Sequence, residues 1–206
     1  IAPYGPNTMT YTAILAAPSA EHLFGTDDFG RDIFSRSLYG IRISLIVGIT
    51  VMLISGLIGL GIGLVAGFYS RLDSPIMRAM DVLMAFPGIL LAIGIMAVLG
   101  PSLLNIIIAL AISYIPRTAR VVRGQVLSLR EQEFVLAARA LGASDWQILL
   151  RYLAPNTMAP LLIQQTFVLA LAVIAESGLN FLGVGVPPDV PTLGSMLSES
   201  RTFLRS

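Results

Sequence analysis

The stretch "ISLIVGITVMLISGLIGLGIGLVAGFY", residues 43–69, carries no charged side chain over 27 positions. At about 1.5 Å of rise per residue, a helix of this length extends about 40 Å, enough to cross a hydrocarbon core of about 30 Å with some tilt. The composition of the whole chain agrees, since 55% of its residues are hydrophobic and only 12% are charged. A soluble domain usually carries about a quarter of charged residues. We therefore predict an all-α, polytopic membrane protein.

Three further apolar runs predict three more membrane spans, at residues 82–99, 102–120 and 157–184. Gly100-Pro101 separates the second span from the third. A single helix across both would be about 52 Å long up to Pro116, too long for one crossing, so the dipeptide predicts a tight hairpin. Pro87 and Pro116 are expected to kink or end their helices. The third span is expected to continue about one turn beyond Pro116, toward Arg120.

The arginines predict the orientation of the four spans. All thirteen cations are arginine, and the chain has no lysine. Eight lie in the two longer connections between spans: Arg71, Arg78, Arg117, Arg120, Arg123, Arg130, Arg139 and Arg151. The other five flank the first and last spans: Arg31, Arg36, Arg42, Arg201 and Arg205. The positive-inside rule therefore predicts that the loop 70–81 and the segment 121–156 are cytoplasmic.

The same rule places segments 1–42 and 187–206 outside the membrane, because an even number of spans puts both on one side. Residues 1–42 then need an upstream span to be exported, and a further span can follow residue 186. The stretch "LGSMLSESRTFLRS", residues 193–206, is amphipathic and predicts a short helix lying on the outer surface.

The long polar stretch between the spans is "REQEFVLAARALGASDWQILLRYLAPN", residues 130–156. Ser128 and Glu131 have the spacing of a capping box, which predicts the start of a helix. Gly142 can take the left-handed conformation that ends it. A second box, "SDWQ" at 144–147, starts another short helix, and Pro155 is expected just past its end. The segment therefore predicts two short helices joined at an elbow.

Small residues crowd this elbow: Ala137, Ala138, Ala140, Gly142 and Ala143. Small side chains allow another backbone or helix to approach closely. Two explanations stay open from the residues alone. One is an ordinary loop with helical content. The other is a docking element, because a long loop with two capped helices is rigid and rigid loops usually contact something.

The sequence "AARALGASDWQILLRYLAPN" resembles the EAA loop of ABC importer permeases of the type-1 transmembrane family. Ala137, Ala138, Gly142 and Pro155 fit the pattern of that loop, whereas Leu136 stands where the family has glutamate and Tyr152 and Ala154 stand where it has isoleucine and leucine. Two outer stretches resemble the dipeptide, oligopeptide and nickel branch of the family. They are "EHLFGTDDFGRDIFSRSLYGIRISLIVG" at 21–48 and "FLGVGVPPDVPTLGSML" at 181–197.

The resemblance implies a permease subunit that forms the translocation path for peptides, nickel or a similar small solute across a bacterial or archaeal inner membrane. It implies six spans in the full subunit, so that the first and last are absent from this chain. It also implies that the segment 121–156 is a coupling loop to an ATPase. The candidate coupling residues in this loop are Ala137, Ala138, Arg139, Gly142, Ala143, Ser144, Asp145 and Pro155.

The partners that the resemblance implies are a second permease subunit, expected to be a different chain, two ATP-binding subunits and an extracytoplasmic substrate-binding protein. A standard P-loop needs a lysine on the phosphates of ATP, and this chain has none. ATP and Mg²⁺ are therefore expected on the partner subunits, with no cofactor and no enzymatic activity in this chain. Neither the net charge of +1 nor any motif points to nucleic acid.

The alternative function is a secondary transporter or channel subunit. That class needs ion ligands within the membrane or discontinuous spans in a repeated pattern. Glu176 is the one acid within a long apolar run, and no internal repeat is evident. Both observations favour the ABC permease.

Two further sets of residues in the spans are candidates for packing or for the pathway. Gly59, Gly63 and Gly67 recur every four residues, a spacing that lets helices pack backbone to backbone in lipid. Polar side chains and proline breaks within the spans either face the solute pathway or make contacts between helices. For Glu176 there is a further alternative, that its side chain reaches the membrane interface. These candidates are Pro87, Asn105, Gln164, Gln165, Glu176 and Asn180.

The outer segment holds the only histidine, His22, near Asp27, Asp28 and Asp32. This set lacks the regular spacing of metal ligands, so we expect no metal site. Asp and Gly in "GTDDFGRD" predict turns and caps instead, with Asp32 paired to a nearby arginine.

Overall fold

The computed structural model describes residues 2–187 and 189–201, and this part of the chain is all-α, as predicted. The helices are α1 (Ile33–Phe68), α2 (Ser70–Met84), α3 (Gly88–Leu99), α4 (Leu103–Leu129), α5 (Glu133–Ala140), α6 (Asp145–Gln147), the π-helix η1 (Ile148–Leu153), α7 (Ala154–Asn156), α8 (Met158–Phe181) and α9 (Leu193–Ser200).

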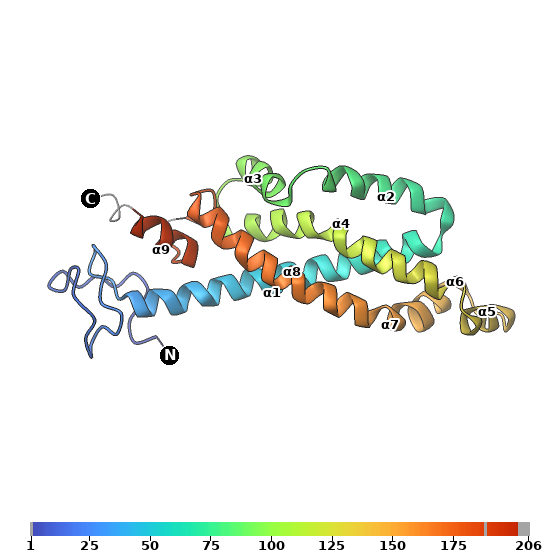
Figure 1. The fold of residues 1–206 in the computed structure, drawn as a ribbon, viewed down its shortest axis with the longest axis horizontal. Coiled ribbons are helices and arrows are strands. Elements are labelled where there is room, and N and C mark those ends of the chain that lie inside the picture. The colour runs from blue at the N-terminus through green and yellow to red at the C-terminus, as the bar shows by residue number, and fades with distance from the viewer. Residues whose placement is uncertain (1, 188, 202–206) are drawn as a thin grey trace.

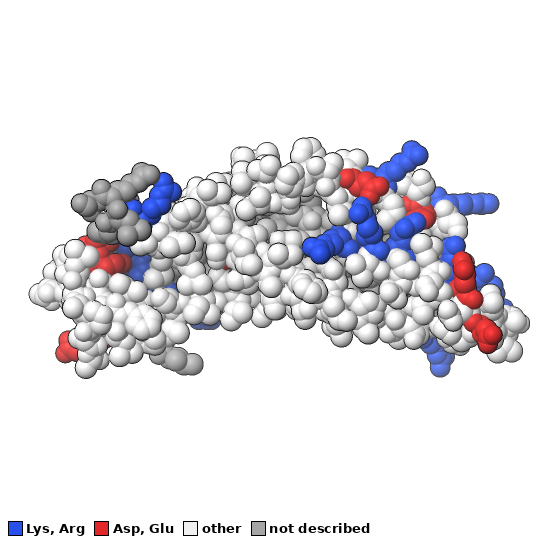
Figure 2. Space-filling view, viewed as in Figure 1, with Lys and Arg blue, Asp and Glu red and all other residues white. Residues whose placement is uncertain are grey.

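Three long helices, α1, α4 and α8, lie side by side along an elongated molecule (Figure 1). Each is long and apolar enough to cross a membrane, and α2 with α3 would add a fourth crossing if this pair, bent by 84°, counts as one broken span. Charged side chains gather toward the two ends of the molecule and leave its middle bare (Figure 2). This distribution is that of a multi-pass membrane protein.

Gly59, Gly63 and Gly67 allow the closest helix contact, between α1 and α4. A Cβ atom built on Gly59 would lie 2.6 Å from the Thr118 side chain, and one on Gly63 would lie 2.6 Å from Val122 Cβ. At Gly67 the nearest atom is Val126 Cβ, at 2.7 Å. These distances leave no room for any side chain on this face of α1, which explains the four-residue spacing.

The predicted loop 70–81 is wrong, because these residues form most of α2. The helix is amphipathic. Met77, Met80 and Leu83 pack against apolar residues of α1 and α4, and two ion pairs, Asp73 with Arg123 and Asp81 with Arg120, hold α2 on α4. The charged residues of this stretch therefore belong to a helix that lies along the bundle, and two of them, Asp73 and Asp81, make its polar contacts to α4.

The predicted span 82–99 is interrupted. Helix α2 ends at Met84 and α3 begins after Pro87, which is its N-cap residue. A proline disfavours helical geometry in the residue before it, here Phe86. The hairpin at Gly100-Pro101 is confirmed, since Gly100 has a φ of +82° and α4 begins at Leu103.

Helix α4 is longer than predicted. It continues through the buried Pro116 to Leu129, so the expected end near Arg120 is wrong. The helix expected to start at Ser128 does not form there, because Ser128 still belongs to α4. The next helix, α5, instead follows Gln132, which gives no side-chain cap. Packing of α4 on α1 outweighs the local capping pattern.

Residues 2–32 and α9 lie at one end of the molecule, and α5 lies at the other (Figure 1). The predicted short helix near the C-terminus is confirmed as α9, with Thr192 and Ser195 forming its capping box. The rest of that prediction, residues 202–206, lies outside the described residues.

Candidate functional site

The elbow between α5 and α6 is built from local hydrogen bonds. Gly142 has a φ of +85°. Its N–H donates to Arg139 O at 3.0 Å, and the Ala143 N–H donates to Ala138 O at 3.0 Å. This pair of bonds is a Schellman motif, which closes the end of α5 and satisfies its last carbonyl groups. The predicted left-handed glycine is therefore confirmed.

A capping box starts the helix on the other side of the elbow. The Gln147 N–H donates to Ser144 Oγ at 3.4 Å, and the Ser144 N–H donates to Gln147 Oε1 at 2.9 Å. Both bonds satisfy backbone donors that a helix start leaves without partners. Between them, the two motifs restrain all residues from Ala138 to Gln147, so the elbow has a defined shape.

Large apolar side chains project from this elbow. Leu141 is 89% exposed and Trp146 is 67% exposed. A Cβ atom built on Gly142 would meet nothing within 4 Å, so the glycine itself faces open space. Exposed apolar side chains on a rigid polar segment are typical of a surface that binds another protein.

The inner side of the elbow is packed into the bundle. Val135 of α5 and Ile148, Leu149 and Leu153 of η1 are buried in one cluster with residues of the three long helices, namely Leu64, Val122, Val126 and Leu161. The elbow is therefore packed against α1, α4 and α8 through this cluster.

The other residues of the predicted coupling set lie around this elbow. Ala137 is exposed and Ala138 is buried. The Arg139 guanidinium lies 5.8 Å from the centre of the Phe68 ring. Asp145 is in the first turn of α6.

Pro155 does not follow the end of a helix as predicted. It lies in α7, directly after the π-helix η1, within a helical path that leads on to α8. The Ala154 N–H donates to Leu149 O, five residues back. A proline has no N–H to offer to the regular helical ladder, and such π-turns are where helices take up irregular bonding.

Gln165 connects the three long helices at mid-bundle. Its Oε1 accepts a hydrogen bond from Ser55 Oγ of α1 at 3.3 Å, and its Nε2 donates to Thr118 Oγ1 of α4 at 3.1 Å. All three residues are buried. Gln164 beside it is also buried, and its Nε2 has no hydrogen-bond partner within the described residues.

Glu176 does not reach the interface, since it is fully buried. Its Oε2 accepts from Ser44 Oγ of α1 at 2.7 Å, and its Oε1 accepts from Asn180 Nδ2. Asn180 Oδ1 in turn accepts from the Val186 N–H at 2.8 Å. This chain of bonds ties α1, α8 and the turn after α8 together.

Asn105 serves the hairpin rather than another helix face. Its Nδ2 donates to Leu99 O at 2.9 Å and to Gly100 O at 3.0 Å. Together with Gln165, Glu176 and Asn180, it makes the hydrogen bonds of helix and turn contacts within this chain. A role of these residues in the solute pathway stays a prediction.

The segment before α1, residues 2–32, uses its titratable residues for caps and ion pairs. Asp32 caps α1 through a bond from the Ser35 N–H to its Oδ2 at 2.8 Å, and its Oδ1 lies 3.0 Å from His22 Nδ1. Burial would raise the pKa of the Asp32 carboxyl, but the hydrogen bonds from Ser35 and His22 outweigh it and hold this pKa below its ordinary value. Asp32 therefore pairs with His22 and not with an arginine as expected.

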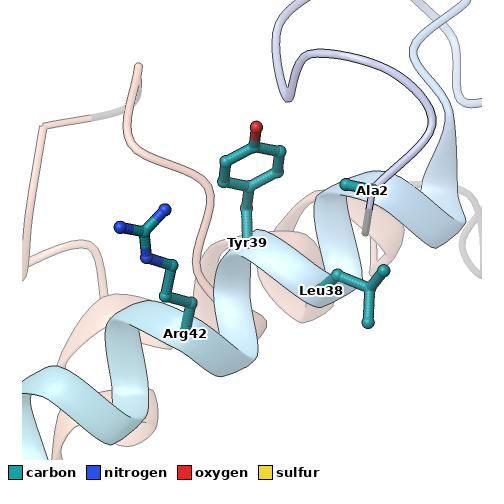
Figure 3. Close-up of a pocket in the computed structure, with 4 residues that line it drawn as sticks. All are labelled: Ala2, Leu38, Tyr39 and Arg42. Carbon is teal, nitrogen blue, oxygen red and sulfur yellow. The ribbon is translucent and has the colours of Figure 1, made fainter.

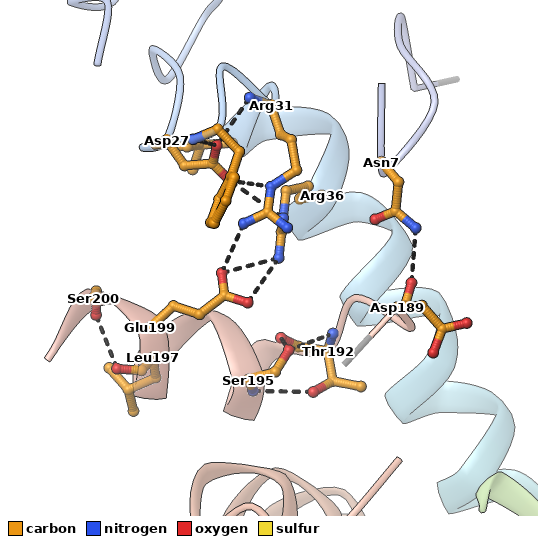
Figure 4. A network of polar contacts seen from close by, with 12 residues as sticks. Asn7, Asp27, Arg31, Arg36, Asp189, Thr192, Ser195, Leu197, Glu199 and Ser200 are labelled. Carbon is orange, nitrogen blue, oxygen red and sulfur yellow. Dashed lines mark hydrogen bonds and ion pairs between the residues drawn. The ribbon is translucent and has the colours of Figure 1, made fainter. Parts of the chain in front are cut away.

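A network of ion pairs, which the sequence did not indicate, joins this segment to α9 (Figure 4). Asp27 Oδ2 lies 2.6 Å from Arg31 Nε and 3.2 Å from Arg36 Nη1. Glu199 of α9 lies 3.1 Å from both guanidinium groups. Arg36 is only 2% exposed, whereas the Glu199 side chain is 41% exposed. The network therefore has a buried guanidinium at its centre and connects α9 to residues 27–36.

The sequence profile described as "binding-protein-dependent transport system inner membrane component" matches residues 59–204, more than half of the chain. This chain belongs to that family. The match includes the elbow, the π-helix, helices α4 and α8, and the last ten residues of α1. The all-α fold and the several apolar helices agree with an inner-membrane permease component.

Relatives within this permease family are similar over almost the whole chain. A putative peptide transport permease of Brucella suis is 51% identical over 198 residues, which are 96% of this chain and 67% of that protein. The dipeptide transport permease of Alkalihalophilus pseudofirmus is 48% identical over 93% of this chain and 64% of its own length. A glutathione transport permease of Escherichia coli is 47% identical over 98% of this chain and 67% of its own length. The chain thus spans about two thirds of the length of the relatives it matches.

Proposed function

We propose that this chain forms part of the path by which an ABC importer moves peptides across the inner membrane. The observation that carries the proposal is its membership of the permease family, with relatives whose names refer to peptides, dipeptides and glutathione. Because glutathione is itself a tripeptide, all three names share the peptide bond. We therefore propose short peptides as the solute class.

The elbow is the docking site for an ATPase subunit in this proposal. Its rigid caps, the exposed Leu141 and Trp146, and the packing of its inner side on the three long helices all support this role. A partner can bias a permease between two states only through contacts that differ between them. The apolar tip supplies such contacts, and the inner cluster passes their effect to the helices.

The complete importer requires further subunits in this proposal. They are a second permease, expected to be a different chain, two ATPases that bind ATP and Mg²⁺, and a substrate-binding protein on the opposite side of the membrane. The arginine distribution supports an elbow on the cytoplasmic side. Residues 2–32 and α9 are then extracytoplasmic, where they meet the delivered peptide or its carrier.

The double variant Leu141→Ser, Trp146→Ser tests the proposal. We expect normal abundance in the membrane, because both side chains are exposed, with loss of peptide uptake and of the co-purifying ATPase. Leu23→Ser is the matched control, since this leucine is equally an exposed apolar residue but lies in the outer segment. Wild-type ATPase recruitment in the double variant, or uptake that persists when ATP hydrolysis is blocked, would contradict the proposal and favour a secondary transporter.

A further inference from the structure

Two adjoining open cavities lie where α1 ends and the elbow folds back on it. One has a volume of about 690 Å³ and the other about 380 Å³. Phe68, Ser70 and Arg139 line both, so the cavities share a wall. They sit directly after the charge-free run that ends at Tyr69, at the end of the molecule where most of the charged side chains gather (Figure 2).

Three arginines line this pair of cavities: Arg71, Arg130 and Arg139. Arg130 Nη1 donates to Gly67 O at 3.1 Å and to Ser70 Oγ at 3.2 Å, which fixes its guanidinium at the wall. Within the described residues, neither Arg71 nor Arg139 has a carboxylate within ion-pair distance.

Two carboxylates also line the cavities, Asp145 in the larger and Glu131 in the smaller. Glu131 lies 3.9 Å from Arg130 Nε, and its side chain is 76% exposed. It therefore reduces the positive charge of the arginines only weakly. The cavity pair keeps an excess of positive charge, with two guanidinium groups free to bind an anion.

Two neighbouring arginines and a cavity at the other end of the run differ from this site. The neighbouring arginines on α4, Arg120 and Arg123, are both paired with aspartates of α2. At the other end of the charge-free run, a cavity of about 340 Å³ is lined by Ala2, Leu38, Tyr39 and a single arginine, Arg42 (Figure 3). Of these cavities, those at the elbow combine three arginines with the Ser70 hydroxyl and the aromatic rings of Phe68 and Tyr69.

We propose that this cavity pair binds the phosphate of an anionic lipid headgroup. Guanidinium groups recognise phosphate oxygens through paired N–H donors, and basic pockets between membrane helices bind such headgroups. Phe68 and Tyr69 stand at the end of the charge-free run, and aromatic side chains at the ends of membrane spans contact the headgroup region. The acyl chains of the lipid then extend along the apolar surface of the helices. This site is independent of peptide binding.

The experiment uses the assembled transporter in nanodiscs of phosphatidylcholine that contain a small fraction of photoactivatable phosphatidylglycerol or, in the second arm, photoactivatable phosphatidylcholine. Labelled peptides are mapped by mass spectrometry. We expect phosphatidylglycerol to label residues around Phe68 and Arg139 in preference to phosphatidylcholine. Arg71→Gln and Arg139→Gln should each lower this labelling about fivefold, the effect of about one arginine near an anionic surface.

Arg78→Gln is the matched control, because Arg78 is an exposed arginine on the same helix α2 but lines neither cavity. Equal labelling by both lipids, or an equal loss in the Arg78 variant, would overturn the proposal. A third arm measures retention of labelled inorganic phosphate in lipid-free detergent. Arginine-dependent retention there without a lipid preference would assign the site to soluble phosphate instead. Loss of the ATPase from the arginine variants with unchanged lipid labelling would make the cavity a protein contact.

Discussion

At Gly142 the backbone conformation restricts which side chain can be accommodated, but the surrounding space does not. The φ of +85° is one that a β-branched residue adopts only with strain, while a Cβ atom there would meet nothing within 4 Å. Gly63 is the reverse case. It has ordinary helical geometry, but a Cβ atom would lie 2.6 Å from Val122 Cβ and 2.7 Å from Ala119 O. Gly142 is therefore needed for its left-handed backbone conformation, and Gly63 is needed for the close contact between α1 and α4.

Gly142→Val is expected to leave abundance normal and to lower peptide uptake and ATPase recruitment about tenfold. The reason is a strain of about 1–2 kcal/mol at the elbow, which displaces Leu141 and Trp146, together with added bulk on the docking surface. Uptake assays and co-purification from membranes measure both effects. Gly142→Asn is the control, since asparagine tolerates the left-handed region. Wild-type uptake in the valine variant would refute a docking role for the elbow.

Gly63→Ala is expected to lower the melting temperature and the membrane abundance of the subunit. The added methyl group must separate α1 from α4, and overpacking of this kind costs about 1–3 kcal/mol. Gly61→Ala is the matched control on the same helix, because a Cβ atom there meets nothing within 4 Å. Equal melting temperatures for the two alanine variants would show that α1 and α4 do not pack as described.

At the scale of elements, the end of the molecule opposite the elbow is held by contacts from a non-helical segment to two helices. Asp32 caps α1 and binds His22, while Asp27 and Glu199 hold Arg31 and Arg36. Residues 2–32 contain no helix of their own. Their position therefore depends on these polar contacts, and the order of the outer segment should respond to the charge on its carboxylates.

The Asp32 cap gives an acid-sensitive contribution to that order. Its folded pKa is lowered from the ordinary value of 3.8, so the stabilisation is fully present above that value and is lost as the pH falls through the folded pKa. We expect proteolysis of residues 2–31 in the reconstituted protein to accelerate below pH 3.8. Asp32→Ala should show fast cleavage already at neutral pH, with about 1 kcal/mol of cap energy lost. Cleavage of this variant at the wild-type rate would contradict the role of the cap.

At the scale of the whole molecule, the elbow and the outer segment lie at opposite ends of one helical bundle (Figure 1). Helices α1 and α4 extend from the elbow cluster through the glycine contact, and α8 connects the elbow to the Glu176 hydrogen bonds near α9. A movement at the elbow thus has a continuous packed route to the outer end.

This arrangement predicts that the two ends lie on opposite sides of the membrane, with the elbow in the cytoplasm. The chain has no cysteine, so Arg139→Cys and Asp28→Cys each introduce a unique thiol at an exposed position of this subunit. An impermeant thiol reagent applied to intact cells should label the Asp28 variant and spare the Arg139 variant until the membrane is opened. Labelling in the opposite order would invert the topology and exclude cytoplasmic docking at the elbow.

The sequence by itself determined the features that depend on neighbouring residues. The charge-free run 43–69 predicted the part of α1 from Ile43 to Phe68, but not its first ten residues. The glycine and serine of "ALGAS" predicted the elbow, because both of its caps are hydrogen bonds between residues at most five apart. The four-residue glycine spacing likewise predicted a packed helix face.

Only the tertiary structure decided what those elements contact. Helix α2 was predicted as a loop because its aspartates find their arginines on α4, about 40 to 50 residues away. Glu176 and Ser44 are separated by 132 residues, and Glu199 and Arg36 by 163. A local pattern of side chains carries no information about such distant partners. The free energy of burying a polar group depends on whether its hydrogen-bond or ion-pair partners are present. The placement of α2, Glu176 and Glu199 is therefore known only from the folded chain.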